Sequence, residues 1–294
     1  MAILKLGNQT VSPVITIKEG SDIGIPREVS STGVYQMPTS SFTFSLPSNA
    51  TDVGTYGLCY AFCGCTALTS VDLSSLTTVS GRYALYYAFE NCTNLTSVDL
   101  SSLVTVTGES ALNSSFYQCT ALTSVDLSSL TTVGYNAMSY TFHQCRPSLI
   151  NINLPSLTTV GASGLYYCFA YCEGLVSANL PSLTTVGAGG LNSAFRTCSN
   201  LTDVNLPSLT TVERLGLSQC FMYCKKLQTL SFPSLTSNSF GSYTNQFNKM
   251  LSEVRGCTVH FPSNLQSVIG SWSDVTNGFG GKNTTVLFDL PATS

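Results

Sequence analysis

The stretch that decides the fold is residues 68–92, LTSVDLSSLTTVSGRYALYYAFENC. Versions of this stretch recur along the chain, and each ends in a cysteine. Seven of these cysteines follow one another at intervals of 26 or 27 residues: Cys65, Cys92, Cys119, Cys145, Cys172, Cys198 and Cys224. A fixed period of about 20–50 residues is typical of stacked repeats. The sequence therefore predicts an elongated solenoid.

The first half of each repeat predicts a short strand. Its apolar pattern is L-x-x-V-x-L, represented by Leu68, Val71 and Leu73. This spacing is typical of a parallel strand that lines a leucine-rich solenoid. Ser-Ser or Pro-Ser follows, and a proline ends the strand because it has no N–H for the ladder. A further inward leucine, such as Leu76, closes this half of the repeat.

The second half of each repeat predicts a short helix. Leu85, Ala88, Phe89 and Cys92 are spaced i, i+3, i+4 and i+7, which is one apolar face of a short α-helix or 3₁₀ segment. One such unit cannot bury its own apolar face, whereas a stack of them buries a continuous core.

The repeat pattern divides the chain into three expected regions. Residues 1–40 lack the repeat and alternate apolar with polar residues, which suggests an N-terminal β-rich cap or attachment segment. Residues 41–240 carry the leucine-rich repeats of 26–27 residues. Residues 241–294 are expected to form a C-terminal capping repeat and strands, because CTVHFPSNL supplies one more strand pattern. No second globular domain is expected.

Composition excludes two classes of partner. Charged residues make up 9% of the chain, against about a quarter in an average protein, and the net charge is −3. Nucleic-acid binding needs a basic face, and the chain has only one adjacent basic pair, Lys225–Lys226. No apolar run approaches the roughly 18 residues of a membrane helix, so membrane insertion is not expected. No signal peptide is visible, since Lys5, Asn8 and Gln9 interrupt the apolar start.

The cysteines are expected to be buried free thiols. Stacked repeats place successive Cβ atoms about 5 Å apart, beyond the ~3.8 Å of a disulfide. Cysteine also behaves as a small hydrophobe. The alternative is a metal held by Cys59, Cys63 and Cys65, but the chain offers only His143 and His260 as further ligands and has no C-x-x-C pair. No metal, cofactor or catalytic residue is predicted.

One polar column is a candidate binding site. Its members share the position between the inward Val and Leu of the strand: Asp72, Asp99, Asp126, Asn153, Asn179 and Asn205. They are expected to project from the concave sheet. One interpretation is a solvated ladder of hydrogen-bonding side chains, and another is a stripe that binds a cation or a basic ligand. A glycosidase pair is the third alternative, but no cleft or third group supports it.

A tyrosine column is the second candidate. It comprises Tyr60, Tyr87, Tyr140 and Tyr167, each two residues after an inward Leu or Met. Tyrosine combines a large contact area with a polar tip, which suits recognition of sugars or proteins. The alternative is packing between repeats, and exposure decides between the two.

The motif L-x-x-V-x-L-P-S-L-x-x-V followed by G-x-x-x-L-x-x-A-F-x-x-C resembles the BspA-like leucine-rich repeat, also called the Treponema pallidum type. The resemblance covers roughly residues 41–262, although the repeats here are longer than is common in that family. It implies an α/β solenoid, a leucine-rich repeat horseshoe with a parallel β-sheet and short helices, capped at both ends. Proteins of this family are typically bacterial surface or secreted proteins of adhesion and recognition, and similar chains are tail-associated proteins of gut-bacterial phages.

These observations together predict a non-enzymatic recognition or adhesion protein. It is expected to bind a host or cell-surface protein or glycan through an extended solenoid surface. Its expected location is extracellular, on the cell surface or on a virion. The alternative function is a structural or assembly component of a phage tail or surface particle. The oligomeric state is left open.

Overall fold

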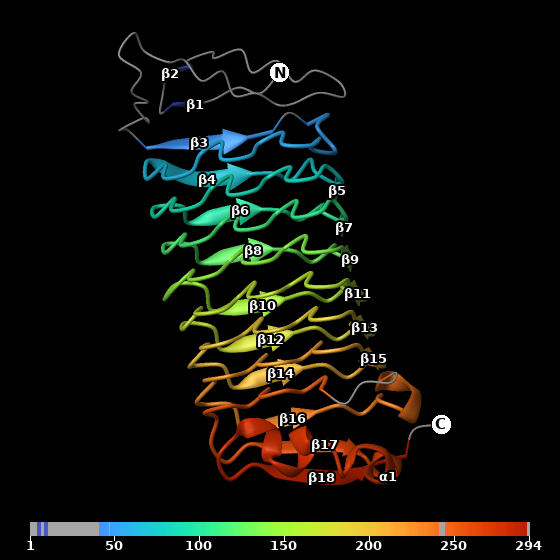
Figure 1. Cartoon of the computed structure of the whole chain (residues 1–294). Coiled ribbons are helices and arrows are strands. Elements are labelled where there is room, and N and C mark those ends of the chain that lie inside the picture. Colours follow the sequence, from blue (N-terminus) through green and yellow to red (C-terminus); the bar gives the residue numbers. More distant parts are fainter. Residues whose placement is uncertain (1–4, 7–8, 11–40, 47, 241–244, 293–294) are drawn as a thin grey trace.

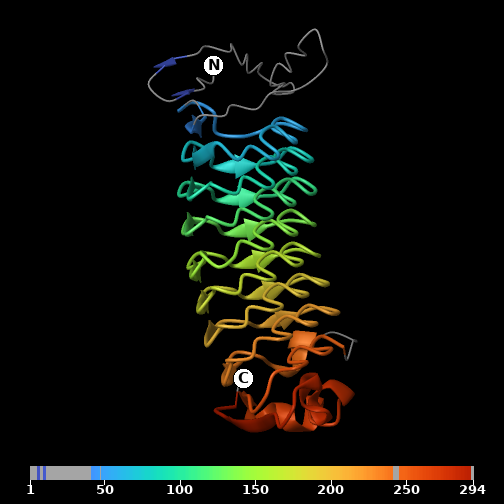
Figure 2. The same ribbon diagram turned by 90° about the vertical axis from the view of Figure 1, so that its left-hand side faces the viewer.

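A computed structural model describes residues 5–6, 9–10, 41–46, 48–240 and 245–292. The chain winds into a solenoid whose turns stack along one axis, with the segments from β3 to β18 following one another in chain order (Figure 1). The view turned by 90° shows the same axial stack, with helical segments at the C-terminal end (Figure 2). The predicted leucine-rich solenoid is confirmed.

The first strand of each turn lies where the L-x-x-V-x-L pattern predicts it. We call this series sheet 1; its strands are β3 (Phe42–Ser45), β4 (Leu68–Asp72), β6 (Ser97–Asp99), β8 (Ser124–Asp126), β10 (Asn151–Asn153), β12 (Ser177–Asn179), β14 (Asp203–Asn205), β16 (Thr229–Ser231), β17 (Thr258–Pro262) and β18 (Thr285–Leu290). Sheet 1 is divided into three hydrogen-bonded groups, which end at β8, β14 and β18. Within each group, neighbouring strands pair in parallel with the residues of one column opposite each other, as in Asp72↔Asp99↔Asp126. The sequence columns are therefore spatial columns.

A second parallel sheet was not predicted. We call it sheet 2; its two-residue strands are β5 (Thr78–Val79), β7 (Thr105–Val106), β9 (Thr132–Val133), β11 (Thr159–Val160), β13 (Thr185–Val186) and β15 (Thr211–Val212). Each strand buries its valine and leaves its threonine half-exposed. Two residues are too few to show the alternation by which a strand is recognised in sequence.

The short helix predicted in each repeat is wrong. Residues 81–92 form overlapping β-turns, in which the Tyr86 N–H donates to the Tyr83 carbonyl within the turn at 3.3 Å. The next N–H, that of Tyr87, donates to the Asn113 carbonyl of the following repeat at 3.0 Å. Tyr83 and Tyr87 have left-handed φ of 55° and 53°. Each is the third residue of another turn, and the Ala88 N–H closes the one around Tyr87 by donating to the Leu85 carbonyl at 3.0 Å. The left-handed residues recur every four positions, so residues i and i+4 face the core as they do in a helix. We call this series of turns, one per repeat, the turn face.

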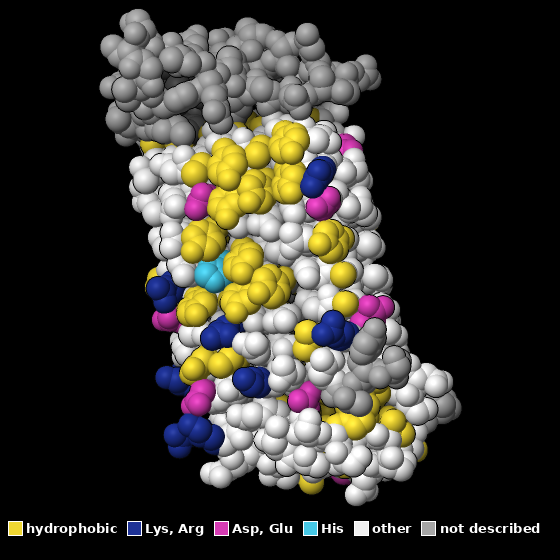
Figure 3. Space-filling model, in the orientation of Figure 1, with side chains coloured by type: hydrophobic (Ala, Val, Ile, Leu, Met, Phe, Trp, Pro, Cys, Tyr) yellow, Lys and Arg dark blue, Asp and Glu magenta, His cyan; other side chains and the backbone are white. Residues whose placement is uncertain are grey.

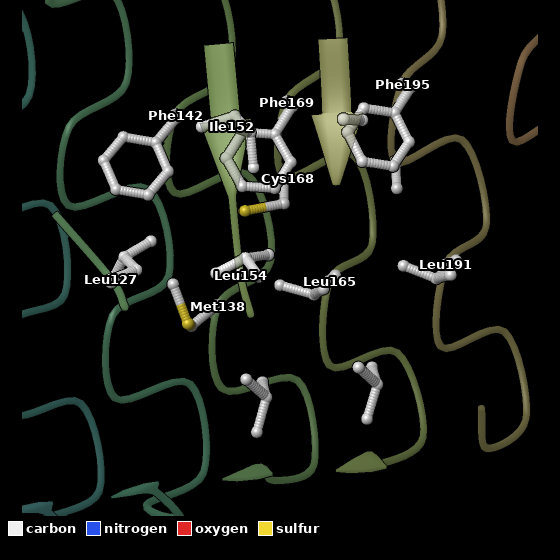
Figure 4. Packing of buried hydrophobic residues seen from close by; sticks show 14 of the residues in the cluster. Leu127, Met138, Phe142, Ile152, Leu154, Leu165, Cys168, Phe169, Leu191 and Phe195 are labelled. Carbon is white, nitrogen blue, oxygen red and sulfur yellow. The ribbon is translucent and has the colours of Figure 1, made fainter. Parts of the chain in front are cut away.

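Aromatic rings stack along the centre of the solenoid. Adjacent rings lie 5.1–5.8 Å apart between centroids and within 11° of parallel. The series comprises Phe62, Phe89, Phe116, Phe142, Phe169, Phe195 and Phe221, all buried. Figure 4 shows three of these rings packed beside the leucines of the same core. This stack is the continuous core that one repeat cannot build alone.

The C-terminal region differs from the regular turns. Helical segments of the described chain are confined to it: η1 (Ser237–Phe240), η2 (Ser263–Leu265), α1 (Gln266–Ile269), α2 (Ser273–Thr276) and η3 (Gly278–Gly280). None of the described helices is long and apolar enough to cross a membrane. At the other end, β1 (Lys5–Leu6) pairs with β2 (Gln9–Thr10) and with β3, all antiparallel. The remainder of the expected cap at 1–40 lies outside the described residues, and the expected domain boundaries stay a prediction.

Candidate functional site

The aspartates of the polar column line a groove on sheet 1. This groove has a volume of about 660 Å³ and runs across β4, β6 and β8. Asp72, Asp99 and Asp126 stand one per turn in its lining, among serines and valines of the same strands. Asn153 lies at its edge, in the next turn.

Each aspartate in this groove also accepts a local hydrogen bond. The backbone N–H of Ser74 donates to Oδ1 of Asp72 at 3.0 Å, and Ser101 donates in the same way to Asp99 at 2.9 Å. Ser128 and Asp126 repeat the arrangement at 2.9 Å. An Asp side chain that accepts from the backbone two residues on forms an Asx-turn. The carboxylates therefore hold the bend at the end of each strand.

The asparagines of the column bond along the stack instead. Nδ2 of Asn179 donates to Oδ1 of Asn153 at 2.8 Å, and Asn205 donates to Asn179 at 2.9 Å. In these turns the residue two positions on is a proline (Pro155, Pro181 or Pro207), which has no N–H to offer. A column residue is thus aspartate where a serine stands two positions later, and asparagine where a proline stands there. The expected ladder of hydrogen bonds is present for the asparagines, whereas the aspartates bond locally; a role of either in ligand binding stays a prediction.

The coupling between these two positions is testable by a double-mutant cycle. Ser101→Pro removes the N–H donor to Asp99, and we expect a loss of about 1 kcal/mol in the free energy of unfolding, the usual net value of one hydrogen bond. Adding Asp99→Asn is expected to restore most of the lost free energy, because an asparagine followed two positions later by a proline already occurs at 153 and 155. Urea unfolding measures both variants. Strictly additive effects would contradict the coupling.

Two clusters of tyrosines lie on the turn face. The first, which we call the upper tyrosine cluster, comprises Tyr56, Tyr60, Tyr83, Tyr86 and Tyr87. Tyr60 stacks on Tyr87 with centroids 5.2 Å apart, and Tyr86 meets Tyr60 edge-on at 5.6 Å. Tyr56 and Tyr60 are 50% and 44% exposed, and the other three are partly exposed.

The second cluster, the lower tyrosine cluster, surrounds a histidine. It comprises Tyr117, Tyr140, Tyr166, Tyr167 and Tyr171 together with His143. Tyr140 stacks on Tyr167 at 5.1 Å, and the buried His143 ring stacks on Tyr117 at 5.0 Å. Asn113 and Ser114 take the places of Tyr86 and Tyr87 in the repeat between the clusters. Figure 3 shows apolar and aromatic side chains gathered in separate groups along this side of the solenoid.

The predicted tyrosine column is therefore two stacked pairs, Tyr60–Tyr87 and Tyr140–Tyr167. Both sequence interpretations describe part of it, since the rings pack between turns and keep part of their surface exposed. Tyr86, Tyr117 and Tyr171 join the clusters without belonging to the column. In the sequence, these residues could have been found as aromatic residues that lie close to the column positions in the same part of the repeat.

Burial shifts the pKa values of several groups in the tyrosine clusters. Burial and the neighbouring Tyr87 raise the pKa of Tyr86 to about 12, and burial likewise raises the pKa of Tyr140. Burial, together with Arg146, lowers the pKa of His143 to about 4. Tyr86, Tyr140 and His143 are therefore uncharged at neutral pH. A positive charge adjoins the upper tyrosine cluster, since the Arg82 guanidinium lies 4.8 Å from the Tyr83 ring centroid.

The cysteine ladder lies inside the core, as predicted. Sγ of Cys92 donates to the Phe62 carbonyl of the previous repeat at 3.1 Å. The same bond recurs in each later turn as far as Cys224, which donates to Phe195 at 3.1 Å. Burial raises the pKa of Cys119 to about 12, so its thiol stays protonated. The ladder is structural. Cys63 is half-buried and donates to Glu90 at 3.2 Å, and the described residues contain no cluster of three potential metal ligands.

A basic pocket near the C-terminal end was not predicted from the sequence. The pocket has a volume of about 390 Å³ and is lined by Tyr223, Lys225, Glu253 and Arg255. Lys225 directly follows Cys224, and Arg255 takes the equivalent position one turn later. The regular spacing is lost after Leu235, so the sequence columns did not bring these two residues together.

Comparison with known proteins agrees with this architecture. The sequence profile of the BspA type leucine rich repeat region matches residues 31–168 and 136–271, with six copies. No curated protein sequence matches the chain.

The chain is also similar to solved structures. One is a leucine rich cell surface protein from Faecalibacterium prausnitzii, with 16% identity over 83% of this chain and 78% of that chain, at a TM-score of 0.26. Another is the pneumococcal vaccine antigen PcpA, with 12% identity over 89% and 92% of the two chains and a TM-score of 0.27. A third is Toll of Drosophila in complex with Spatzle, with 15% identity over 79% of this chain and 33% of that chain, at 0.32.

The family profile spans well over half of the sequence. The repeat that it describes corresponds to one turn of the solenoid, with its strands, its turns and its part of the stacked core. The chain belongs to the BspA-type leucine-rich repeat proteins.

Proposed function

We propose that this chain is a non-enzymatic recognition or adhesion protein that works at a cell or particle surface. It binds a partner protein or glycan through the two tyrosine clusters of the turn face. The observation that carries the proposal is the pair of partly exposed, stacked tyrosines in each cluster, Tyr60–Tyr87 and Tyr140–Tyr167. BspA-type repeats are of a kind usually involved in protein binding or adhesion, which supports the same conclusion.

The physical properties of the clusters suit this role. Packing between turns already fixes the rings, so little side-chain entropy is lost when a partner covers them. A ring face stacks on a sugar or an apolar side chain, while the hydroxyl group hydrogen-bonds at its edge. The 9% charge content gives the surface little long-range attraction, so short-range contacts of this kind must supply the affinity. The polar column from Asp72 to Asn205 is proposed as a secondary contact surface.

Replacing the stacked pairs tests the proposal. Tyr60→Ser/Tyr87→Ser and Tyr140→Ser/Tyr167→Ser are expected to weaken binding at least about tenfold, since buried aromatic contacts dominate interfaces. Serine suits these left-handed positions because Ser114 and Ser193 occupy equivalent ones with φ of 55° and 57°. Glycan and surface-protein arrays identify the partner, and biolayer interferometry measures the affinities.

Tyr135→Ser is the matched control. Tyr135 is 60% exposed and belongs to neither cluster, so its replacement is expected to leave the affinity within about twofold. Arrays that yield no specific partner, or double variants that bind as tightly as the unmodified protein, would remove the support for this function.

A structural component of a phage tail or surface particle is the second candidate. The observation that favours it is the outer edge of β18, whose only strand partner in the described chain is β17. Residues Val286, Leu287 and Phe288 of this strand are partly exposed, and an open edge is a ready site for pairing with another chain. Sedimentation velocity over a range of concentrations separates the candidates, because end-to-end assembly gives growing oligomers and an adhesion protein does not require them.

A further inference from the structure

Two pairs of charges that stack between successive turns are opposite in sign. Arg146 and Glu173 occupy the same position of successive turns, and Nη1 of the arginine lies 2.6 Å from Oε1 of the glutamate. Arg82 and Glu109 make a second such pair at 3.0 Å, also one repeat apart. Opposite charges in neighbouring strands attract, whereas like charges directly opposite each other are destabilising.

The last turns bring positive charges together instead. The position that follows the cysteine ladder is held there by Lys225 and then by Arg255, which pairs in parallel with Lys282 of the next turn. Three cations therefore follow one another along one edge of the stack. Glu253 forms an ion pair with Lys282 at 2.8 Å. Neither Lys225 nor Arg255 makes an ion pair within 4 Å among the described residues.

These two cations line the same pocket. Lys225 and Arg255 share it with the half-buried ring of Tyr223 and with Glu253. A further cation lies beside the pocket, since the guanidinium of Arg196 is 5.8 Å from the Tyr223 ring centroid. Arg196 is held in place by a bond to Oε1 of Gln219 at 2.7 Å. The site thus combines excess positive charge, an aromatic ring and a volume of about 390 Å³, within the usual range for small-ligand pockets.

We propose that this pocket binds an acidic saccharide, a sugar unit that carries a carboxylate or a sulfate. The anion lies between Lys225 and Arg255 and relieves the repulsion between them through charge-assisted hydrogen bonds. The Tyr223 ring contacts the sugar ring beside it. This site is separate from the tyrosine clusters and does not depend on their function.

Glu253 distinguishes this ligand from a dense polyanion. Its bond to Lys282 lowers the pKa of Glu253, so the carboxylate is charged at neutral pH. A negative carboxylate in the pocket repels a second anionic group nearby, but it accepts hydrogen bonds from sugar hydroxyls. One anionic group surrounded by hydroxyls therefore fits better than the closely spaced phosphates of a nucleic acid.

Binding of defined saccharides to the full chain tests the proposal. The probes are a hyaluronan oligosaccharide with carboxylates only, a keratan sulfate oligosaccharide with sulfates only, and neutral dextran of similar size. Isothermal titration calorimetry at low salt measures their binding. We expect one of the acidic probes to bind at least about tenfold more tightly than dextran, as charge-assisted bonds are stronger than neutral ones. The preferred acidic probe identifies the anionic group. Equal binding of all three probes, or no binding of either acidic one, would overturn the proposal.

Single charge replacements locate the site. Lys225→Gln and Arg255→Gln are each expected to weaken binding of the preferred probe about tenfold. Lys226→Gln is the matched control, because Lys226 is the exposed neighbour of Lys225, loses the same charge and does not line the pocket. Its expected change is within about twofold. An equal loss in Lys226→Gln would mean general attraction to positive charge, and the pocket would be rejected. Tyr60→Ser/Tyr87→Ser is expected to bind the probe normally, so failure here and failure of the proposed function are distinguishable.

Discussion

Gly108→Ala is expected to destabilise the solenoid by about 3 kcal/mol or more, because overpacked positions without room to relax lie at the upper end of such effects. A Cβ atom at this position would overlap the Gly81 carbonyl oxygen. It would also lie 2.7 Å from the Gly81 carbonyl carbon and 2.8 Å from the Ser80 carbonyl oxygen. All three are backbone atoms of the previous turn, so the clash is relieved only if the two turns move apart. Thermal and urea unfolding followed by circular dichroism measure the loss.

Gly54→Ala is the control for this substitution. Gly54 stands one turn before Gly81 in the same column, and a Cβ atom there would have no neighbour within 4 Å. The chemical change is identical, but none of the described residues lies within 4 Å of the added atom. We expect stability within about 0.5 kcal/mol of the unmodified protein. Similar losses in both variants would show that the spacing of the turns is not set by this contact.

Phe116→Ala is expected to cost about 3–5 kcal/mol, the usual range for removing a buried phenylalanine. The Phe116 ring is fully buried and stacks on two others, Phe89 at 5.1 Å and Phe142 at 5.4 Å. In a repeat protein each turn is stabilised chiefly by its two neighbours, so a gap in the middle weakens both contacts. We also expect the single unfolding transition to separate into two, one for each side of the gap.

The end of the stack supplies the comparison. Phe288 is only partly buried and stacks on Phe261 alone, at 5.8 Å. Phe288→Ala is expected to cost less than half as much and to leave the transition single, because no turn is cut off from the rest. Differential scanning calorimetry distinguishes one transition from two. A small, undivided shift for Phe116→Ala would show that the stacked rings add little to cohesion between turns.

The stacking of the repeats could be predicted from the sequence, because residues that recur at the repeat period lie above one another in the structure. The register Val71↔Val98↔Val125 confirms this directly. It was insufficient for the second half of the repeat. Leu85 and Phe89 are four residues apart, and that spacing fits a helix and a series of four-residue turns equally well. The hydrogen bond from Tyr87 to Asn113 decides between them, and it joins two repeats.

The candidate sites show a similar limit. The change from Asp126 to Asn153 was visible in the sequence, but its cause lies two residues away, in the exchange of Ser128 for Pro155. The tyrosine column was recognised by its period, whereas the ring contacts that make it two clusters involve neighbouring positions as well. The basic pocket could not be predicted from the repeat columns, because it depends on Arg255, which lies beyond the last regular repeat.

The alternating hydrogen bonds of the turn face have a mechanical consequence. Two successive turns are joined on three sides: through sheet 1, through sheet 2 and through turn-face bonds such as Tyr87 to Asn113. A pull along the axis that acts on the whole cross-section of a turn is therefore shared among all the bonds between two turns. Turns joined in this way resist such tension together, whereas a pull on one chain end loads the bonds of the terminal turn first.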